Sequence, residues 1–191
     1  MNPPPLSPPP PIRRISVFGA PGAGKTVLAH ELFVHFKKQG RSCEVLNELA
    51  REWAYVDRPI QSMDQLYLFA TQMHREDTLL TRDKCEFVIT DSPVMLNAFY
   101  GTLTSPELTH AYCEFGRSFD RKFRSVNLFC PIDESFVFHS EGRYHSRTDA
   151  LRLEAQILEF ALSITPAGEL SVLKTPHRMS AAVSILQGLG I

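Results

Sequence analysis

The sequence predicts one three-layer α/β domain, in which helices cover both faces of a five-stranded parallel sheet. Short β-rich runs alternate along the chain with longer stretches whose apolar residues recur at helical spacing. Such alternation is typical of right-handed βαβ crossovers, which build parallel sheets and place ligands at the carboxyl ends of the strands. The length of 191 residues suits a single domain, which we place at 13–191.

The first strand is predicted over 14–18, an apolar run that stops at a glycine. A helix is predicted over 26–38, because its apolar residues share one face and Gly40 follows it as a typical C-terminal signal. We expect a second strand over 43–46 and a short helix over 50–56.

A long helix is predicted over 62–82, since a Ser-x-x-Gln capping box opens it. The run Phe-Val-Ile-Thr at 87–90 is the third predicted strand, and a short helix should follow Pro93 and reach about residue 100. Ser-Pro-Glu then opens a further helix over 106–123, because proline and an acid are favourable in a first helical turn.

The fourth strand is predicted over 126–129. Residues 131–148 are polar, rich in Arg and His and without a clear period, so we expect a mobile loop with little regular structure. Asp149 should precede a helix that ends at Leu162. A fifth strand over 170–174 and a last helix over 181–186 complete the prediction.

Composition limits the classes of protein to consider. A formal net charge of −1 gives no global attraction to nucleic acid or to anionic membranes. The four cysteines show no metal-ligand spacing, and no apolar run is long enough to span a bilayer, so we expect a cytoplasmic protein without a membrane partner. Residues 1–12 include seven prolines, which predicts a disordered tail.

Residues 19–26 match the pattern G-x-x-x-x-G-K-[ST] in full, between an apolar strand and an amphipathic helix. In such a loop, backbone N–H groups surround phosphate oxygens, the lysine reaches the β- and γ-phosphates and the hydroxyl binds Mg²⁺. The sequence therefore predicts a site for ATP and Mg²⁺. The loop comprises Gly19, Ala20, Pro21, Gly22, Ala23, Gly24, Lys25 and Thr26.

Acidic residues follow two other predicted strands. Asp91 comes directly after the third strand, where it would hold Mg²⁺ or accept a proton, or else cap the following helix. Glu48 follows the second strand and is placed to face the cleft. Arg51 could bind an acceptor's phosphate or an acid of the cleft. In the alternative, Glu48 and Arg51 are solvated and Trp53 packs into the core.

The polar segment between the fourth strand and its helix carries Arg143 and Arg147. In small kinases this segment forms a lid, whose arginines neutralise charge on the transferring phosphoryl group and exclude water. We predict this role for both arginines and assign none to His139 or His145; a solvated loop is the alternative.

With these motifs in view, the chain resembles the P-loop kinases grouped around thymidylate kinase and, more distantly, nicotinamide riboside kinases. The resemblance is closer to bacteriophage kinases that phosphorylate 5-hydroxymethyluracil in DNA. Besides the phosphate loop it rests on Glu-Leu-Ala-Arg-Glu-Trp at 48–53, Asp-Gln-Leu-Tyr at 64–67, Ile-Thr-Asp-Ser-Pro at 89–93 and Gly-Arg at 142–143.

The resemblance implies transfer of the γ-phosphoryl group of ATP to the 5-hydroxymethyl group of 5-hydroxymethyl-deoxyuridine in phage DNA, a modification that evades host restriction. From deoxynucleoside kinases it implies that Glu48 is the general base and that Trp53 lines the acceptor pocket. Asp91-Ser92 departs from the Asp-Arg of thymidylate kinases, which disfavours a free monophosphate acceptor. Kinases of free nucleosides, thymidylate or nicotinamide riboside remain alternatives, as does an NTPase switch acting on a protein.

Overall fold

A computed structural model describes most of the chain. Residues 11 and 12 are the only part of the predicted tail that it describes. Ser62, the first residue of the predicted capping box, lies outside the described residues. The described residues are 11–61, 63–81, 85–133, 141–166 and 168–191.

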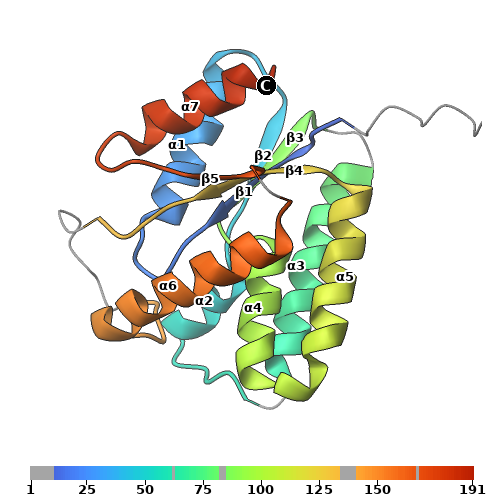
Figure 1. Ribbon diagram of the computed structural model, residues 1–191, viewed down its shortest axis with the longest axis vertical. Coiled ribbons are helices and arrows are strands. Elements are labelled where there is room, and N and C mark those ends of the chain that lie inside the picture. Colours follow the sequence, from blue (N-terminus) through green and yellow to red (C-terminus); the bar gives the residue numbers. More distant parts are fainter. Residues whose placement is uncertain (1–10, 62, 82–84, 134–140, 167) are drawn as a thin grey trace, which may run out of the picture.

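A five-stranded sheet, with every neighbouring pair parallel, forms the middle layer (Figure 1). Its order is β2-β3-β1-β4-β5, so the first strand of the sequence lies at the centre. The predicted fold class and all five predicted strands are confirmed. The strands are β1 (Arg14–Phe18), β2 (Cys43–Leu46), β3 (Phe87–Thr90), β4 (Ser125–Phe129) and β5 (Leu170–Val172).

Helices cover both faces of the sheet, each over its own apolar cluster (Figure 1). Two of them pack together on one face, α1 (Lys25–Lys38) and α7 (Arg178–Gly188). On the other face lie α3 (Asp64–Thr81), α4 (Val94–Thr104), α5 (Thr109–Lys122) and α6 (Arg147–Ile164). The short helix α2 (Leu49–Tyr55) follows β2, and a 3₁₀ turn (Pro106–Leu108) precedes α5.

Several helix boundaries differ from the prediction: α7 extends beyond the predicted 181–186 at both ends, and the helix predicted over 106–123 is a 3₁₀ turn followed by α5. Two other differences involve identifiable contacts. The helix α4 continues past residue 100 to Thr104, and Gly101 in this added turn lets the Tyr112 ring of α5 pack 2.6 Å from the place a Cβ would occupy. The helix α6 begins at Arg147 and not after Asp149, because Ser146 is the N-cap and Asp149 completes a capping box. Residues 147 and 148 therefore belong to α6 and not to the predicted loop.

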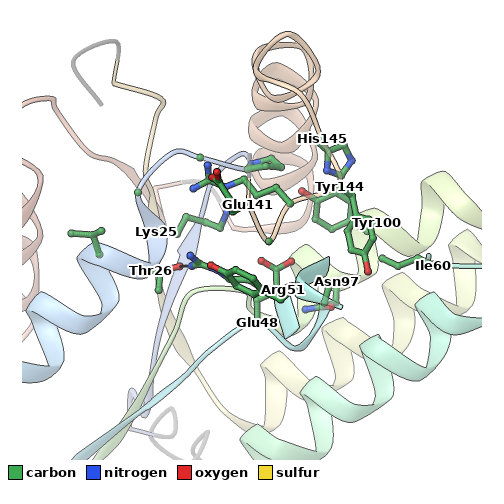
Figure 2. Close-up of a pocket in the computed structure, with 18 of the residues that line it drawn as sticks. Lys25, Thr26, Glu48, Arg51, Ile60, Asn97, Tyr100, Glu141, Tyr144 and His145 are labelled. Atoms are coloured by element: carbon green, nitrogen blue, oxygen red, sulfur yellow. Dashed lines mark hydrogen bonds between the residues drawn. The ribbon is translucent and has the colours of Figure 1, made fainter. Parts of the chain in front are cut away.

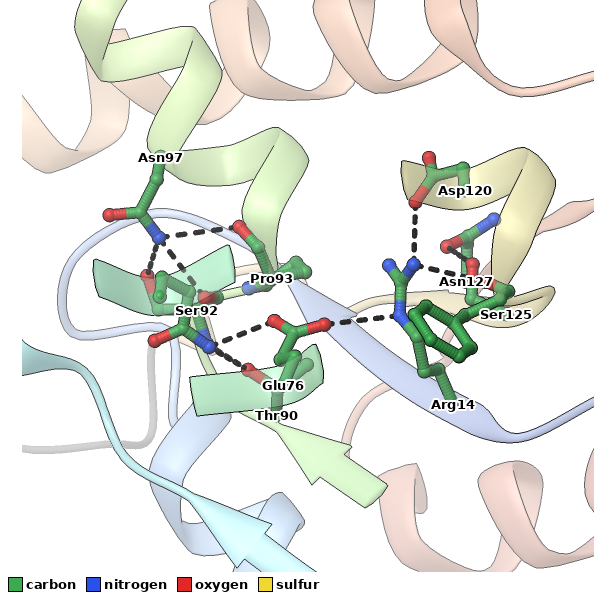
Figure 3. Close-up of polar contacts among 11 residues, drawn as sticks. Arg14, Glu76, Thr90, Ser92, Pro93, Asn97, Asp120, Ser125 and Asn127 are labelled. Atoms are coloured by element: carbon green, nitrogen blue, oxygen red, sulfur yellow. Dashed lines mark hydrogen bonds and ion pairs between the residues drawn. The ribbon is translucent and has the colours of Figure 1, made fainter. Parts of the chain in front are cut away.

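An ion pair lies buried between the sheet and α3 (Figure 3). Arg14 Nε lies 3.1 Å from Glu76 Oε2, and the two side chains are 1% and 0% exposed. Arg14 Nη1 also contacts Asp120 Oδ1 at 2.7 Å and donates to the Phe123 carbonyl at 3.0 Å. Burial raises the pKa of Glu76, and the charge of Arg14 opposes that rise, so the arginine favours the charged form of this buried acid.

We expect Arg14→Met to lower the free energy of unfolding by about 3–5 kcal/mol at neutral pH, because it leaves Glu76 buried without its cation. The loss should shrink as the pH falls below the raised pKa of Glu76, where the acid becomes neutral in the folded protein. Urea unfolding at several pH values measures both effects.

Lys122→Met is the matched control, since it removes the cation of an exposed pair, 2.7 Å from Asp77. This change should cost at most about 1 kcal/mol. Equal losses in the two variants would contradict the view that burial decides the effect.

Candidate active site

The turn between β1 and α1 has the tight geometry that the phosphate-loop pattern predicts. Gly19 and Gly24 have φ values of +148° and +87°, a region that other residues rarely adopt. A Cβ on Gly19 would lie 2.4 Å from the Cys130 carbonyl oxygen, so no side chain is tolerated there. Lys25 is 8% exposed and its Nζ donates to the Ala20 carbonyl at 2.9 Å, curled over the loop to which it belongs.

Arg178, the first residue of α7, supports the loop from behind. Its Nη1 donates to the Ala23 carbonyl at 2.7 Å, and its Nη2 donates to the Pro131 carbonyl at 2.7 Å and lies 3.7 Å from Asp133 Oδ2. The arginine thereby ties the phosphate loop to the segment that follows β4. No sequence pattern predicts this contact, because the two partners are 155 residues apart.

Thr26, Asp91 and Arg51 meet where β1, β2 and β3 end. Thr26 Oγ1 donates to Asp91 Oδ2 at 2.6 Å and accepts from Arg51 Nη1 at 3.2 Å. Asp91 is 2% exposed, and its Oδ1 atom has no hydrogen-bond partner among the described residues. A buried carboxylate oxygen in this condition requires a proton, a water molecule or a cation.

Glu48 precedes α2 and lies in the same pocket, between the phosphate loop and the side chains of Tyr100 and Asn97 (Figure 2). Burial raises the pKa of its carboxyl group, and Asp91 raises it further, while Lys25 and Arg51 oppose the shift. A carboxylate whose pKa is raised by its surroundings is a stronger proton acceptor than one in water.

The predicted lid segment forms one wall of the pocket, through Gly142, Arg143, Tyr144 and His145. Gly142 has a φ of +67°, and a Cβ there would lie 2.6 Å from the ring of Tyr55, so the absence of a side chain permits this close contact. Burial and then Arg51 lower the pKa of Arg143. A nearby anion would stabilise the charged form of this guanidinium.

Arg147 does not line the pocket. It is exposed at the first position of α6, so of the two predicted lid arginines only Arg143 reaches the pocket wall. His145, to which the sequence assigns no role, does line the pocket, with its ring centroid 6.0 Å from that of Tyr100. His139 lies outside the described residues.

Trp53 does not line the pocket either. It is 8% exposed and stacks on Tyr67 with the ring centroids 5.7 Å apart, and the Arg58 guanidinium lies 3.5 Å from a Trp53 ring centroid. The alternative raised for this residue, that it packs into the interior, is the one the structure shows. Tyr55, two residues further along α2, reaches the pocket instead.

The pocket also contains polar residues to which the sequence assigned no role. Gln65 and Asn97 are buried, and Gln65 Nε2 donates to the Asn97 carbonyl at 3.4 Å. Burial, and then the charge of Glu48, raise the pKa of Tyr100, so its hydroxyl stays neutral. Gln65 belongs to the Asp-Gln-Leu-Tyr motif, and Asn97 and Tyr100 lie on the part of α4 that was predicted, but no local pattern indicated that these side chains line the pocket.

The pocket has a volume of about 670 Å³, and its two ends differ chemically. One end holds backbone N–H groups, Lys25 and Thr26, which suit phosphate oxygens. The other end holds amides and tyrosines, which suit a polar organic group.

Thr26 and Asp91 also fit a magnesium ion. Mg²⁺ takes few protein ligands and completes its shell with water and phosphate, and the described residues contain no group of three or more His, Cys, Asp and Glu that would form a protein cage. A hydroxyl beside a partly unsatisfied carboxylate matches that preference.

Comparisons with known proteins agree with this architecture. A family model described as an AAA domain matches residues 14–165, whereas no curated protein matches. A deoxyadenosine kinase from M. mycoides has a similar structure, with a TM-score of 0.57, 15% identity and coverage of 92% of this chain and 97% of that chain. The protein APE1195 gives a TM-score of 0.51 and 19% identity, with coverage of 93% and 94%. At these identities the likeness concerns the fold.

Within the described residues, no helix is long and apolar enough to cross a membrane.

Proposed function

This chain belongs to the AAA domain family, and on that premise we propose that it is an ATP-dependent kinase whose acceptor is a hydroxyl of a nucleoside-like molecule. The observation that carries the proposal is Glu48, a carboxylate whose pKa is raised by burial in the same pocket as Lys25 and Thr26. Binding of ATP and Mg²⁺ does not require this second acid. Transfer to an acceptor hydroxyl requires a group that accepts its proton, and Glu48 is placed to be that group.

At the phosphate end, backbone N–H groups of the loop and the Lys25 ammonium bind the β- and γ-phosphates. Thr26 and Asp91 would hold Mg²⁺, which neutralises charge on the phosphates. Lys25 has to leave the Ala20 carbonyl to reach the nucleotide, so it exchanges a neutral hydrogen bond for a contact with an anion.

At the acceptor end, Glu48 accepts the proton of the attacking hydroxyl. Arg51 lies between the two ends, 3.2 Å from Thr26 Oγ1, and its charge favours an acceptor brought close to the phosphates. Arg143 closes the lid wall and stabilises charge on the transferring group, and we assign this role to Arg143 in preference to the exposed Arg147.

As acceptor we favour the 5-hydroxymethyl group of 5-hydroxymethyl-deoxyuridine in DNA, which would make the protein a phage enzyme of DNA modification. The support is the combination of sequence motifs at 48–53, 64–67, 89–93 and 142–143. Gln65 and Asn97 supply amides of the kind that hydrogen-bond a base edge. The near-neutral net charge of −1 is the observation against a polymeric substrate.

Incubation with γ-labelled ATP and a panel of acceptors tests both the kinase activity and the choice of acceptor. We expect label in DNA that contains 5-hydroxymethyluracil, and none in the same DNA built with thymine, which lacks the hydroxyl. Label in free deoxynucleosides alone would establish a nucleoside kinase, the alternative favoured by the likeness to deoxyadenosine kinase. ATP turnover that responds to no acceptor and requires a protein partner would establish an NTPase switch.

A further inference from the structure

A chain of buried polar side chains runs from β1 to the carboxyl end of β3 (Figure 3). It begins with the pair of Arg14 and Glu76. Glu76 Oε1 accepts from Gln72 Nε2 at 2.8 Å, and the same nitrogen donates to Thr90 Oγ1 at 3.1 Å. None of these side chains is more than 2% exposed, and Thr90 immediately precedes Asp91.

Main-chain and side-chain groups together hold the backbone around Asp91. The Asp91 N–H donates to the Leu46 carbonyl at 3.4 Å. The next N–H, that of Ser92, donates to Thr90 Oγ1 at 3.4 Å, and the Ser92 carbonyl accepts from Asn97 Nδ2 at 3.1 Å. Thr90 and Asn97 thus hold the strand end on either side of Asp91.

The negative charge of Glu76 determines the orientation of the Gln72 amide. The Glu76 carboxylate, paired with Arg14, can only accept hydrogen bonds, so Gln72 must turn its NH₂ group toward it. The same NH₂ group then donates to Thr90 Oγ1, which is left to act as an acceptor for the Ser92 N–H as well. A neutral group in place of Glu76 would not fix the Gln72 amide in this orientation.

Stability alone does not account for the chain, because replacing a buried ion pair with apolar residues of similar volume is often neutral or stabilising. We propose that Thr90, held by Gln72 and Glu76, is a positioning residue that orients Asp91 toward the metal. The inference rests on the proposed function, in which Asp91 binds the metal.

The test compares Thr90→Val, which keeps the shape and removes the acceptor, with Thr90→Ser, which keeps the hydroxyl. Binding of Mn²⁺ in the presence of a non-hydrolysable ATP analogue, followed by EPR, should weaken about tenfold in Thr90→Val and stay near wild type in Thr90→Ser. Amide exchange over 90–93, measured without metal, should accelerate in Thr90→Val only. Gln72→Met should reproduce both effects, and combining it with Thr90→Val should add little, since both act through one hydrogen bond.

A Thr90→Val protein that melts at a lower temperature but binds Mn²⁺ as the wild type does would show a merely structural role and overturn the inference. Additive losses in the double variant would also count against it, since the residues would then act separately. If the wild-type protein binds no Mn²⁺ with the nucleotide analogue, the proposed function itself is wrong and the inference falls with it. The two failures are therefore distinguished by the wild-type titration.

Discussion

Lys25→Ala should lower phosphoryl transfer by about 10³-fold or more while the protein remains folded. The lysine is the one cation of the phosphate loop, and among the described residues its Nζ donates one hydrogen bond, to the Ala20 carbonyl. That bond is worth about 1 kcal/mol in the free protein, far less than a contact with the charge of a triphosphate. Transfer of label from ATP measures the first effect and thermal melting the second.

Lys38→Ala is the matched control, because Lys38 is exposed at the other end of α1 and lies outside the pocket. It should leave transfer unchanged. Wild-type turnover by Lys25→Ala would show that 19–26 is an ordinary turn and would remove the basis of the proposed function. A melting temperature many degrees below that of the wild type would make its inactivity uninformative, and Lys25→Met would then replace it.

Local signals predicted the fold and the tight turn at 19–26 well. The runs that became β1, β2 and β3 have the predicted bounds. The strands β1 and β3 lie inside the sheet and are buried along their whole length, which makes their sequences largely apolar and easy to recognise. The phosphate loop follows from residues adjacent in sequence. Its conformation needs only the preceding strand, the following helix and glycines at defined positions.

The acceptor end was predicted less well, because tertiary packing decides which side chains reach the pocket. Trp53 and Tyr55 lie on one short helix, and nothing in the local sequence determines which of the two rings lines the pocket and which packs into the interior. Asn97 and Tyr100 lie on the predicted part of α4, but which face of that helix turns toward the pocket depends on its packing against α3 and α5. Arg178 supports the phosphate loop from a helix near the end of the sequence.

Asp91→Asn should raise the Mg²⁺ concentration needed for half-maximal activity, because an amide is a weaker ligand than a carboxylate for a hard cation. It should leave the dependence on acceptor concentration nearly unchanged, since Asp91 bonds to Thr26 at the phosphate end. An Asp91→Asn protein with the Mg²⁺ requirement of the wild type and no transfer would instead assign the base to Asp91. Distinguishing a metal ligand from a general base at Asp91 requires separate titrations of Mg²⁺ and of the acceptor.

Glu48→Gln should lower transfer by about 10²–10⁴-fold with little change in ATP affinity, the effect expected on removal of a general base. Wild-type transfer should rise as the pH passes upward through the raised pKa of Glu48, because the base acts only when ionised, and the variant should lack this rise. The same shift has a consequence for stability. An acid with a raised pKa in the folded state favours folding when protonated, and this contribution is lost as the pH rises through that pKa.

At neutral pH, Glu48→Gln should therefore be at least as stable as the wild type, and its advantage should disappear below the ordinary pKa of glutamate. Glu52→Gln is the control, since Glu52 is exposed on the same helix and should change neither transfer nor its pH profile. Full transfer by Glu48→Gln would remove the acid on which the proposed chemistry rests. A stable, ATP-binding and inactive Glu48→Gln would separate the role of Glu48 in catalysis from any role in folding, because a residue that serves the fold does not raise stability when it is removed.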